Sequence, residues 1–368
     1  MRKIKKKCLI TNFAPHYRKA IYQLMDQQLG CDFVFGNNGG DIKKLDYSLL
    51  KNNVEEVRYS RVGSFIWQKD IIKYVFKPYS HIILIGEFTC LSKWTILFLS
   101  KLLRKKIILW GHGWKGVGSW RSRLLCKNFY DLSDGVLVYG DYAKNIMIRD
   151  GFKNKRIFPV HNSLDYDKQL EIRKSILPSD IYTDHFKNTN KNFIFIGRLI
   201  KAKQLDMILQ VLKIFNESGQ KYNITYIGSG EDEDRLKQLA NDYNLNEQVW
   251  FYGACYDEKE LSELIYNSDM CISPGDIGLT VMHCLVYGCP VISHNNFSKQ
   301  GPEFEAIKEG ITGDFFEYNN IESLQKVIEN WFVASRSRED VRNAAYSEID
   351  TNWTPYYQLK IIREALEI

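Results

Sequence analysis

The stretch FIFIGRLIKAKQLD, residues 193–206, decides the fold. An apolar run ends at Gly197, two cations follow at Arg198 and Lys203, and apolar residues then recur at helical spacing from Leu205. This pattern predicts a buried strand, a tight turn and a helix that begins at once. Because glycine lets a ligand approach the backbone, and a helix start with two cations neutralises phosphoryl oxygens, the segment predicts a diphosphate site. Taken alone, it could also be an ordinary turn with two solvated cations.

Similar alternations of apolar strands and amphipathic helices extend over the rest of the chain. Strands are predicted at residues 7–12, 33–36, 81–85, 106–110, 135–139 and 156–160, and then at 193–196, 222–227, 249–252, 270–273, 290–293 and 314–316. Such an alternation predicts parallel sheets with helices on both faces and ligands at the carboxyl ends of the strands. The chain is therefore expected to be an α/β protein with two similar halves.

The length of 368 residues exceeds the size of a usual single core, which favours two domains. The predicted boundaries are a first domain at 1–168, a linker at 169–190, a second domain at 191–344 and a terminal helix at 345–368. The linker is predicted because that stretch is polar, contains Pro178 and has no strong period. A content of 45% hydrophobic and 26% charged residues is typical of a soluble globular protein.

Composition excludes several classes of protein. The eight cysteines form no CxxC pair, so buried thiols are expected rather than disulfides or a metal site. The apolar run at 94–103 is interrupted by Lys101 and is too short to span a membrane, and the basic start lacks the features of an export signal. Cations cluster at 101–106 and at the start of the chain, in Arg2, Lys3, Lys5, Lys6 and Lys7. They could form a solvated face or attract an anionic membrane surface.

Four further glycine turns follow the first one in the second half. They are YIGSGE at 226–231, VWFYG at 249–253, ISPGDIGLTV at 272–281 and YGCPVI at 287–292. Each joins a predicted strand to a helix or a helix to a strand, and each alone is common in α/β proteins. Their order and spacing together closely resemble the carboxyl-terminal domain of family 4 glycosyltransferases with the GT-B fold, most strongly over residues 192–316.

This resemblance implies a fold, an activity and a location. The fold would be GT-B, with two Rossmann-like domains facing each other across a cleft and a terminal helix that crosses back to the first domain. The activity would be hexosyl transfer, with retention, from a UDP- or GDP-linked sugar to a carbohydrate or lipid-linked oligosaccharide acceptor. No metal, other cofactor or nucleic acid would take part. Surface polysaccharide biosynthesis in the cytoplasm, peripheral on the inner face of the cytoplasmic membrane, is the implied setting.

Carried over by position, the resemblance also implies the donor site. Arg198 and Lys203 would hold the diphosphate as catalytic residues and stabilise the charge that grows on the leaving group. The implied donor-binding residues are Gly197, Gly228, Gly230, Glu231, Gly253, Pro274, Gly275, Asp276, Gly278, Leu279, Thr280 and His283.

The chain departs from the family where two glutamates are usual, because Gly275 and His283 stand there. Glycine offers no acceptor to sugar hydroxyls, and a neutral histidine offers only one. Glu303 and Glu305 are candidate substitutes.

The first half supplies the predicted acceptor side. In WGHGWK, residues 110–115, a strand ends and His112 is predicted to project between two glycines as a catalytic residue, with Trp110 and Trp114 offering ring faces to a sugar. The alternative is a packed loop in which His112 caps a helix. Glu87 and Arg18 also follow predicted strands, and we expect them to bind the acceptor.

Two other functions were weighed against transfer. A nucleotide-sugar epimerase on the same fold would need an acid–base pair at the sugar, which the loss of both family glutamates does not supply. A catalytically weak nucleotide-sugar-binding protein is compatible with Gly275 and His283. The acidic triplets at 165–167 and 232–234 resemble a metal motif of another fold. The triplet at 232–234 is predicted to lie in the first turn of a helix, where acidic side chains are favoured by the helix dipole without any metal.

Overall fold

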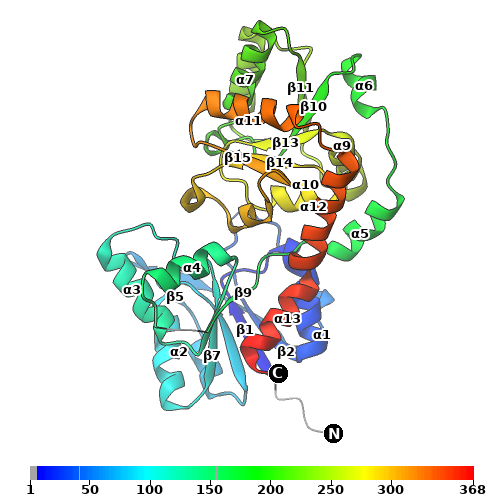
Figure 1. Ribbon diagram of the computed structural model, residues 1–368. Coiled ribbons are helices and arrows are strands. Elements are labelled where there is room, and N and C mark those ends of the chain that lie inside the picture. The colour runs from blue at the N-terminus through cyan, green and yellow to red at the C-terminus, as the bar shows by residue number, and fades with distance from the viewer. Residues whose placement is uncertain (1–5, 41, 154–155) are drawn as a thin grey trace. The chain divides into compact units, whose positions relative to one another are not determined.

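The computed structural model describes residues 6–40, 42–153 and 156–368 and divides into two compact units (Figure 1). The first unit comprises Met1–Tyr166 and Trp353–Ile368, and the second comprises Asp167–Asn352. The basic residues Arg2, Lys3 and Lys5 lie outside the described residues.

The first unit is built on a sheet of seven parallel strands among its described residues. The strands are β1 (Lys7–Thr11), β2 (Cys31–Gly36), β3 (Val54–Val57), β6 (His81–Ile85), β7 (Lys106–Gly111), β8 (Gly135–Val138) and β9 (Ile157–Pro159). Their order is β3-β2-β1-β6-β7-β8-β9. Successive side chains alternate between two apolar cores, since Cys8 and Ile10 join one cluster and Leu9 joins the other.

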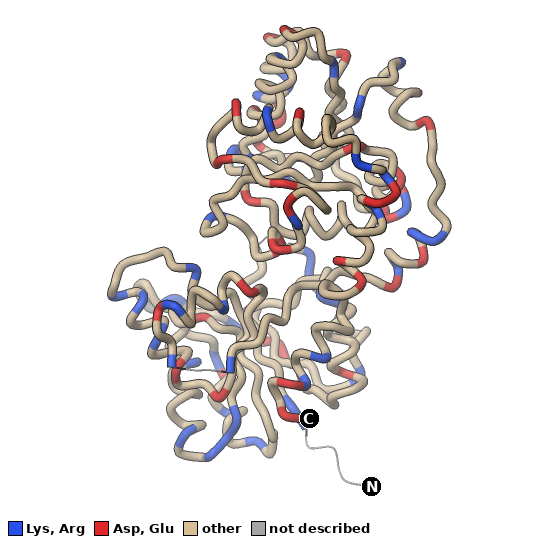
Figure 2. Tube along the Cα trace, in the orientation of Figure 1, with Lys and Arg blue, Asp and Glu red and all other residues tan. Residues whose placement is uncertain are grey.

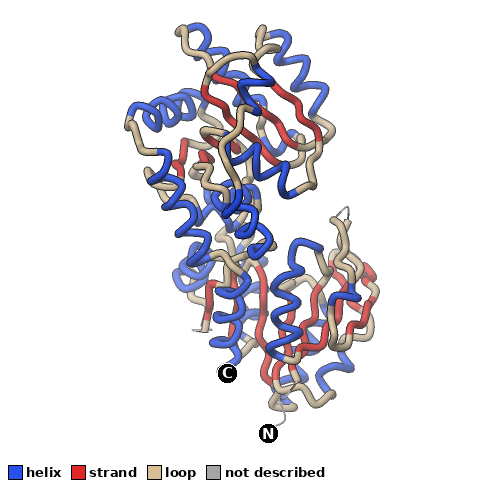
Figure 3. The backbone as a smooth tube through the Cα atoms, turned by 90° about the vertical axis from the view of Figure 1, so that its right-hand side faces the viewer, coloured by secondary structure: helices blue, strands red, loops and turns tan. Residues whose placement is uncertain are grey.

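Helices cover both faces of this sheet (Figure 3). They are α1 (Lys19–Leu29), α2 (Leu91–Leu102), α3 (Trp120–Asp131), α4 (Asp141–Arg149) and α13 (Pro355–Leu366). Short 3₁₀ helices at η1 (His16–Arg18), η2 (Tyr47–Leu49) and η3 (Ile72–Phe76) and an antiparallel hairpin of β4 (Tyr59–Val62) and β5 (Phe65–Gln68) complete the described part of this unit.

The second unit repeats the architecture with six parallel strands among its described residues. They are β10 (Lys191–Ile196), β11 (Tyr222–Ile227), β12 (Val249–Gly253), β13 (Met270–Ser273), β14 (Val291–His294) and β15 (Gly313–Phe316), in the order β12-β11-β10-β13-β14-β15. The helices are α5 (Tyr166–Ser175), α6 (Ile181–Phe186), α7 (Asp206–Glu217), α8 (Glu233–Asp242), α9 (Glu258–Asn267), α10 (Thr280–Val286), α11 (Ile321–Val333) and α12 (Arg338–Asn352). The 3₁₀ helices are η4 (Lys201–Lys203), η5 (Phe297–Lys299) and η6 (Pro302–Ala306).

The predicted α/β class and all twelve predicted strands are confirmed, with ends that differ by one or two residues. β3 and the β4–β5 hairpin were not predicted. The segment 169–190, predicted to be a linker, contains most of α5 and the whole of α6. The cysteines are all free, and all except Cys255 are buried.

The predicted terminal helix at 345–368 is divided into the end of α12 and α13. The division occurs at Thr354, whose side chain accepts a hydrogen bond from Tyr357 N–H and whose successor is a proline at the first helical position. α13 packs on α1 in the first unit, and Trp353 and Tyr357 stack on the His161 ring at centroid distances of 4.4 and 5.1 Å.

Candidate functional site

In each sheet, successive strands are added first toward one edge and then, from a central strand, toward the opposite edge. In the second sheet β10 lies between β11 and β13, and in the first sheet β1 lies between β2 and β6. Loops leave such a pair of strands in opposite directions and open a crevice at their carboxyl ends, where α/β sheets bind ligands. The residues after β10 and β13, and those after β1 and β6, are therefore the candidate sites.

The loop after β10 is shaped by contacts between backbones. Gly197 adopts φ 146°, and a Cβ on Gly228 would lie 1.8 Å from the Gly197 carbonyl oxygen. A Cβ on Gly230 would lie 2.2 Å from the carbonyl oxygen of Leu199. The loops after β10 and β11 can approach this closely only because glycine stands at both positions. The predicted importance of these glycines thus has a structural reason, independent of any ligand.

The two predicted cations lie in this loop, in different surroundings. Arg198 is exposed and makes no side-chain hydrogen bond or ion pair with the described residues. Lys203 ends η4, and its ammonium contacts the carbonyl oxygen of Asp276 and lies 3.9 Å from that residue's Oδ2. Burial lowers the pKa of Lys203, while Asp276 and the nearby Glu303 act to raise it.

The loop after β13 packs directly on the loop after β10. The Gly275 N–H donates to the Lys203 carbonyl oxygen at 3.0 Å. A Cβ on Gly275 would lie 2.3 Å from the Ala202 carbonyl oxygen and 2.7 Å from the Lys203 Cα. A glutamate therefore cannot replace Gly275 without moving one of the two loops, which accounts for the departure from the family pattern.

An acid nevertheless lies one residue further on. Asp276 is exposed, and its Oδ1 accepts a hydrogen bond of 2.6 Å from Gly301 N–H. The next residue is also held, because Ile277 N–H donates to the side chain of Gln300 at 3.0 Å. Asp276 is thus a carboxylate fixed beside Lys203, at the end of β13.

His283 lies on α10, one turn beyond this loop. Burial lowers its pKa, an effect that Glu258 partly offsets, so the ring is neutral near pH 7. Its Nδ1 is buried and has no hydrogen-bond partner among the described residues. A neutral ring nitrogen of this kind can accept one hydrogen bond from a ligand hydroxyl.

The other predicted donor residues lie at the ends of strands, at a helix start or in the loops between them. Glu231 is exposed beyond β11, Gly253 ends β12, and Thr280 begins α10 with its hydroxyl donating to the Ile196 carbonyl oxygen at 2.8 Å. Pro274, Gly278 and Leu279 lie in the loop after β13.

The predicted helix with apolar residues recurring from Leu205 is confirmed, and a 3₁₀ turn that was not predicted precedes it. η4 intervenes and α7 begins at Asp206, whose carboxylate lies 3.5 Å from Arg235. The start of α7 is thus nine residues from Gly197 and is separated from it by a 3₁₀ turn. Arg198 and Lys203 thus lie in the nine-residue connection that precedes α7, and their predicted binding of a diphosphate stays a prediction.

Acidification is expected to destabilise the second unit through His294, the last residue of β14. This residue is 1% exposed, and burial lowers its pKa from 6.5 to about 4, with Lys299 acting in the same sense and Asp276 against it. Because the unfolded chain binds more protons between these two pKa values, the stability contribution is complete above pH 6.5 and is lost as the pH falls toward 4. The expected loss of unfolding free energy is about 3 kcal/mol.

Urea unfolding of the full chain across this pH range measures that loss. The ring Nδ1 accepts a hydrogen bond from Asn296 N–H at 3.1 Å, which a glutamine oxygen could also accept, so His294→Gln is the matched variant. The variant is expected to show a smaller pH dependence than the wild type. Equal pH dependence in both proteins would refute this assignment.

In the first unit, the crevice after β1 and β6 is a cavity of about 460 Å³. Three predicted residues, Arg18, Glu87 and His112, line it together, although they are far apart in the sequence. The loops after β2 and β7 and Tyr139 after β8 contribute further lining. The structure thus brings the predicted acceptor-side residues to one place, while their acceptor role stays a prediction.

Arg18 follows β1 and is held by groups from two later parts of the chain. Its Nη2 donates to the Tyr139 hydroxyl at 2.5 Å and to Asn162 Oδ1 at 3.2 Å. The guanidinium carbon lies 5.3 Å from the centre of the Trp110 ring and 5.0 Å from that of Tyr139. These contacts fix the guanidinium on an aromatic surface.

Glu87 is an ion-paired carboxylate at the same cavity. Its Oε2 lies 2.8 Å from the Lys93 ammonium, whose side chain is fully buried in α2. The Tyr59 hydroxyl lies 3.3 Å from the same oxygen, and burial together with Glu87 raises the pKa of Tyr59. Glu87 is therefore a fixed, charged hydrogen-bond acceptor at the cavity wall.

The loop at 110–115 differs from the prediction in one respect. His112 is exposed at the cavity, with its ring 4.9 Å from that of Tyr139. Trp110 and Trp114 are only 1% and 5% exposed, and Trp114 donates its indole N–H to Asp150 at 2.8 Å. The predicted stacking of these two indoles on a sugar ring is therefore wrong, because both rings are packed in the cores of the first unit.

Sequence patterns missed several residues that shape this cavity. Tyr139, Asn162 and Lys93 position the predicted residues, but each comes from a different element. A sheet places the loops after β1, β7 and β8 at one edge, so Tyr139 could have been found as the residue that follows a strand. Lys93 carried no comparable signal, because it occupies a buried position on an amphipathic helix.

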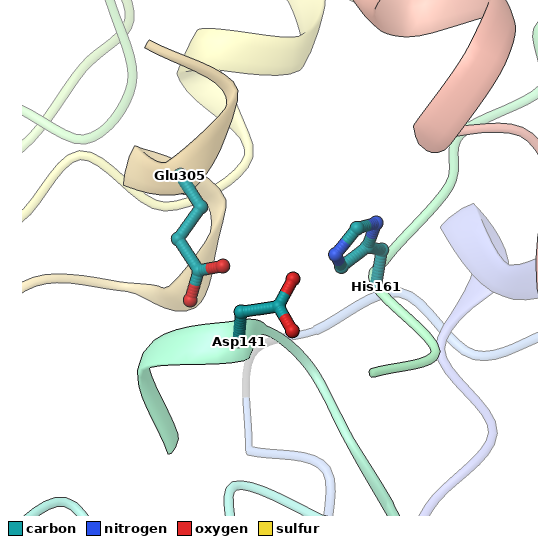
Figure 4. A group of neighbouring side chains, drawn as sticks. All are labelled: Asp141, His161 and Glu305. Atoms are coloured by element: carbon teal, nitrogen blue, oxygen red, sulfur yellow. The ribbon is translucent and has the colours of Figure 1, made fainter. Parts of the chain in front are cut away.

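Two potential metal ligands of the first unit lie close together. In Figure 4 the Asp141 carboxylate points toward the His161 ring, and their ligand atoms lie within 4.8 Å of each other. Both belong to the first unit, whereas Glu305 in that view belongs to the second. Two side chains are fewer than the three or four protein ligands typical of zinc sites. The predicted non-metal explanation of the acidic triplet at 232–234 is supported by Asp232, which pairs with Arg235 at the start of α8.

No helix among the described residues is both long and apolar enough to cross a membrane.

Comparison with known sequences finds a family model that matches most of the second unit. Residues 182–348, somewhat less than half of the chain, match the glycosyl transferases group 1. An uncharacterized 41.2 kDa protein in the cps region of Klebsiella pneumoniae is 28% identical over 212 residues, which cover 56% of this chain and 52% of that protein. An uncharacterized glycosyltransferase of Haemophilus influenzae is 25% identical over 227 residues, which cover 61% of this chain and 59% of that protein. The chain thus spans little more than half the length of these curated relatives.

Solved structures resemble the chain over almost its whole length. The apo form of the lipopolysaccharide outer core galactosyltransferase WaaB has a TM-score of 0.73 at 15% identity and covers 98% of this chain and 99% of its own. Anabaena HepE in complex with UDP-glucose has a TM-score of 0.69 at 14% identity and covers 98% of this chain and 100% of its own. Residues 182–348 therefore carry the sequence pattern of the glycosyl transferases group 1, and the chain has the GT-B fold.

Proposed function

We propose that the chain is a glycosyltransferase of the hexosyltransferase type that uses a nucleotide-diphosphate sugar as donor. The observation that carries the proposal is the loop after β10, where Arg198 and Lys203 lie at the point of strand reversal of the second sheet. This is where such a sheet binds a nucleotide, and Arg198 has no competing partner among the described residues.

The proposed roles follow from charge and hydrogen bonding. Arg198 and Lys203 would bind the diphosphate and stabilise the negative charge that develops on it as the sugar leaves. The protonated side chains alone supply this charge stabilisation, so the proposal includes no metal or other cofactor. His112 would act at the sugar from the first unit. Transfer with retention is proposed from the resemblance of the second half to retaining enzymes.

UDP is the proposed nucleotide, because the HepE structures were obtained with UDP and with UDP-glucose. The acceptor is proposed to be a carbohydrate or a lipid-linked oligosaccharide of surface polysaccharide biosynthesis. The matches to WaaB and to a protein in a cps region support this setting.

Thermal unfolding of the full chain with UDP, GDP and ADP tests the donor. A ligand that binds only the folded state raises the melting temperature, by an amount that grows with its concentration over its Kd. UDP is expected to give the largest rise. A rise in melting temperature with GDP only would change the proposed nucleotide from UDP to GDP and leave the rest of the proposal intact. No rise with any nucleoside diphosphate at millimolar concentration would refute the proposal.

Incubation with UDP-sugars, followed by NMR, separates transfer from the two rival functions. A new glycosidic linkage on an added acceptor supports a transferase. An altered sugar still bound to UDP would indicate an epimerase, which the comparisons do not favour. Tight donor binding with neither product would indicate a binding protein.

We also propose that the first unit binds an anionic membrane surface peripherally. Large apolar side chains are exposed on the neighbouring helices α2 and α3, with Phe98 at 55%, Leu102 at 79%, Trp120 at 70% and Leu124 at 50%. Exposed cations lie on or directly after the same helices, in Lys101, Arg104, Arg121 and Arg123, and Figure 2 shows such cations along this part of the first unit. Exposed apolar residues among cations are the pattern of interfacial membrane binding.

Co-sedimentation with vesicles tests this surface. The full chain is expected to bind vesicles of phosphatidylglycerol and phosphatidylcholine more tightly than vesicles of phosphatidylcholine alone, and less tightly at high salt. Trp120→Ser is expected to weaken binding about tenfold, since it removes the burial of one large side chain. The control is Val333→Ser, which changes an apolar residue that is 79% exposed on α11. Equal loss in both variants, or no preference for anionic vesicles, would contradict the proposal.

A further inference from the structure

The cavity of the first unit contains a cation that has no acidic partner. Arg18 donates Nη2 hydrogen bonds to the Tyr139 hydroxyl and to the Asn162 side-chain oxygen, and both groups are neutral. The titratable groups that act on it are tyrosines, namely Tyr139, Tyr22 and Tyr17. Among the described residues no carboxylate lies within ion-pair distance of Arg18, so its charge is not neutralised by the protein.

Part of this guanidinium is also without a hydrogen-bond acceptor. The Nε–H of Arg18 is buried and has no hydrogen-bond partner among the described residues. Leaving a buried donor unpaired is unfavourable, and more so when the group is charged. A ligand oxygen in the cavity that accepts from Nε would supply the missing hydrogen bond.

The other charges of the cavity do not supply the missing anion. The lining carboxylate of Glu87 is paired with the Lys93 ammonium at 2.8 Å, so the two charges cancel. The hydroxyl of Thr11, which also lines the cavity, already donates to the Phe13 carbonyl oxygen at 2.8 Å. Arg18 is thus a cation at the cavity whose charge is not balanced by any carboxylate of the described residues, which favours a ligand with an oxyanion.

We infer that Arg18 binds an oxyanion, a phosphate or a carboxylate, on the molecule that occupies this cavity. The identification of that molecule as the sugar acceptor rests on the proposed function, and it makes the acceptor an anionic sugar rather than a neutral one. The anion site itself depends only on the contacts of Arg18. A volume of about 460 Å³ is sufficient for a monosaccharide with one such group.

Titration calorimetry of the full chain with glucose, glucose 6-phosphate and glucuronate tests the inference. All titrations are made with and without UDP, so that the loop after β10 cannot account for the signal. At least one anionic sugar is expected to bind ten times more tightly than glucose or better. A preference confined to glucose 6-phosphate would indicate a phosphate as the natural group, and one confined to glucuronate would indicate a carboxylate; both support the inference. Equal binding of all three sugars would overturn it.

The matched variants are Arg18→Gln and Lys19→Gln, which each remove one cation at adjacent positions. Lys19 does not line the cavity, and its ammonium lies 3.8 Å from Asp165. Arg18→Gln is expected to lose the preference for the anionic sugar, and Lys19→Gln is expected to keep it. A preference that persists in Arg18→Gln would overturn the inference.

A measurement on the wild-type protein covers the case in which Arg18→Gln does not fold. The Arg18 Nε–H is buried, so its NMR resonance should be protected from exchange, and Arg18→Lys assigns that resonance by its loss. Addition of the preferred anionic sugar is expected to shift the resonance, whereas glucose should not. An unmoved resonance under saturating anionic sugar would overturn the inference. Failure of UDP to bind would remove the proposed function and leave this anion site standing.

Discussion

Replacing Arg198 with alanine is expected to lower kcat for sugar transfer about a hundredfold and to leave the melting temperature unchanged. The stabilising effect of one donor that faces a developing negative charge is typically 10²–10³ in kcat. Arg198 is exposed and makes no side-chain hydrogen bond or ion pair with the described residues, so its loss should not affect the fold. Initial rates with a saturating UDP-sugar donor, together with thermal unfolding, measure both effects.

Lys201→Ala is the matched control for this prediction. Lys201 is an exposed cation of η4 in the same loop, and the family resemblance assigns it no role. Its removal should change kcat less than about twofold, because a solvated charge that does not contact the diphosphate is screened. Equal losses of kcat in Arg198→Ala and Lys201→Ala would contradict a specific role of Arg198, because they would show that only the total positive charge of the loop matters.

Introducing the family glutamate as Gly275→Glu is expected to destabilise the second unit and to abolish donor binding. Even a Cβ at this position would lie 2.3 Å from the Ala202 carbonyl oxygen, so the loops after β10 and β13 would have to separate. Overpacking of this kind typically costs about 1–3 kcal/mol of unfolding free energy. Separation of the two loops would also move Lys203, whose carbonyl oxygen accepts the hydrogen bond from Gly275 N–H. Urea unfolding and calorimetry with UDP measure the two losses.

The control for Gly275→Glu is Gly278→Asn in the same loop. Gly278 has φ 52°, which asparagine tolerates, and a Cβ there would meet no atom within 4 Å. The expected change in unfolding free energy is below about 1 kcal/mol. If Gly275→Glu were as stable as the wild type and bound UDP, the explanation of the missing glutamate would be wrong.

Local patterns were sufficient to predict the strands and the glycine turns. Both sheets are parallel, and their strands other than the edge strand β3 appear in the sequence as short apolar runs bounded by glycine or polar residues. The glycines at 197, 228 and 275 occupy positions where backbones meet, and this requirement acts within a few residues of each strand end. For these reasons the α/β class and the positions of the glycine turns were predictable, and the order of those turns carried the resemblance to the GT-B fold.

Contacts between distant segments could not be predicted in the same way. Arg18 is held by Tyr139 and Asn162, more than 120 residues away, and no periodicity links them. The burial of Trp110 and Trp114 likewise depends on helices and strands that are not adjacent in sequence. A tryptophan next to glycines is equally compatible with a packed core and with an exposed sugar-binding loop.

The second difference between the predicted and the observed structure concerns α5, a helix with few apolar residues. α5 buries only Gln169 within its span, and it is held by polar contacts such as the pair between Arg173 and Asp350 at 2.8 Å. Such a helix has no apolar stripe, so its sequence is similar to that of a polar linker. Tertiary ion pairs, rather than the pattern of residues 169–190, determine its position.

The central claim is tested most directly by calorimetric titration of UDP into three proteins. These are the wild-type full chain, the double variant that carries both Arg198→Ala and Lys203→Ala, and the control variant Lys201→Ala. Hydrogen bonds to charged groups contribute about 1.5–3 kcal/mol each, so loss of both cations should weaken binding at least about a hundredfold. Wild-type and Lys201→Ala affinities should agree within about threefold. Unchanged UDP affinity in the double variant, or no binding of any nucleoside diphosphate to the wild type, would contradict the account.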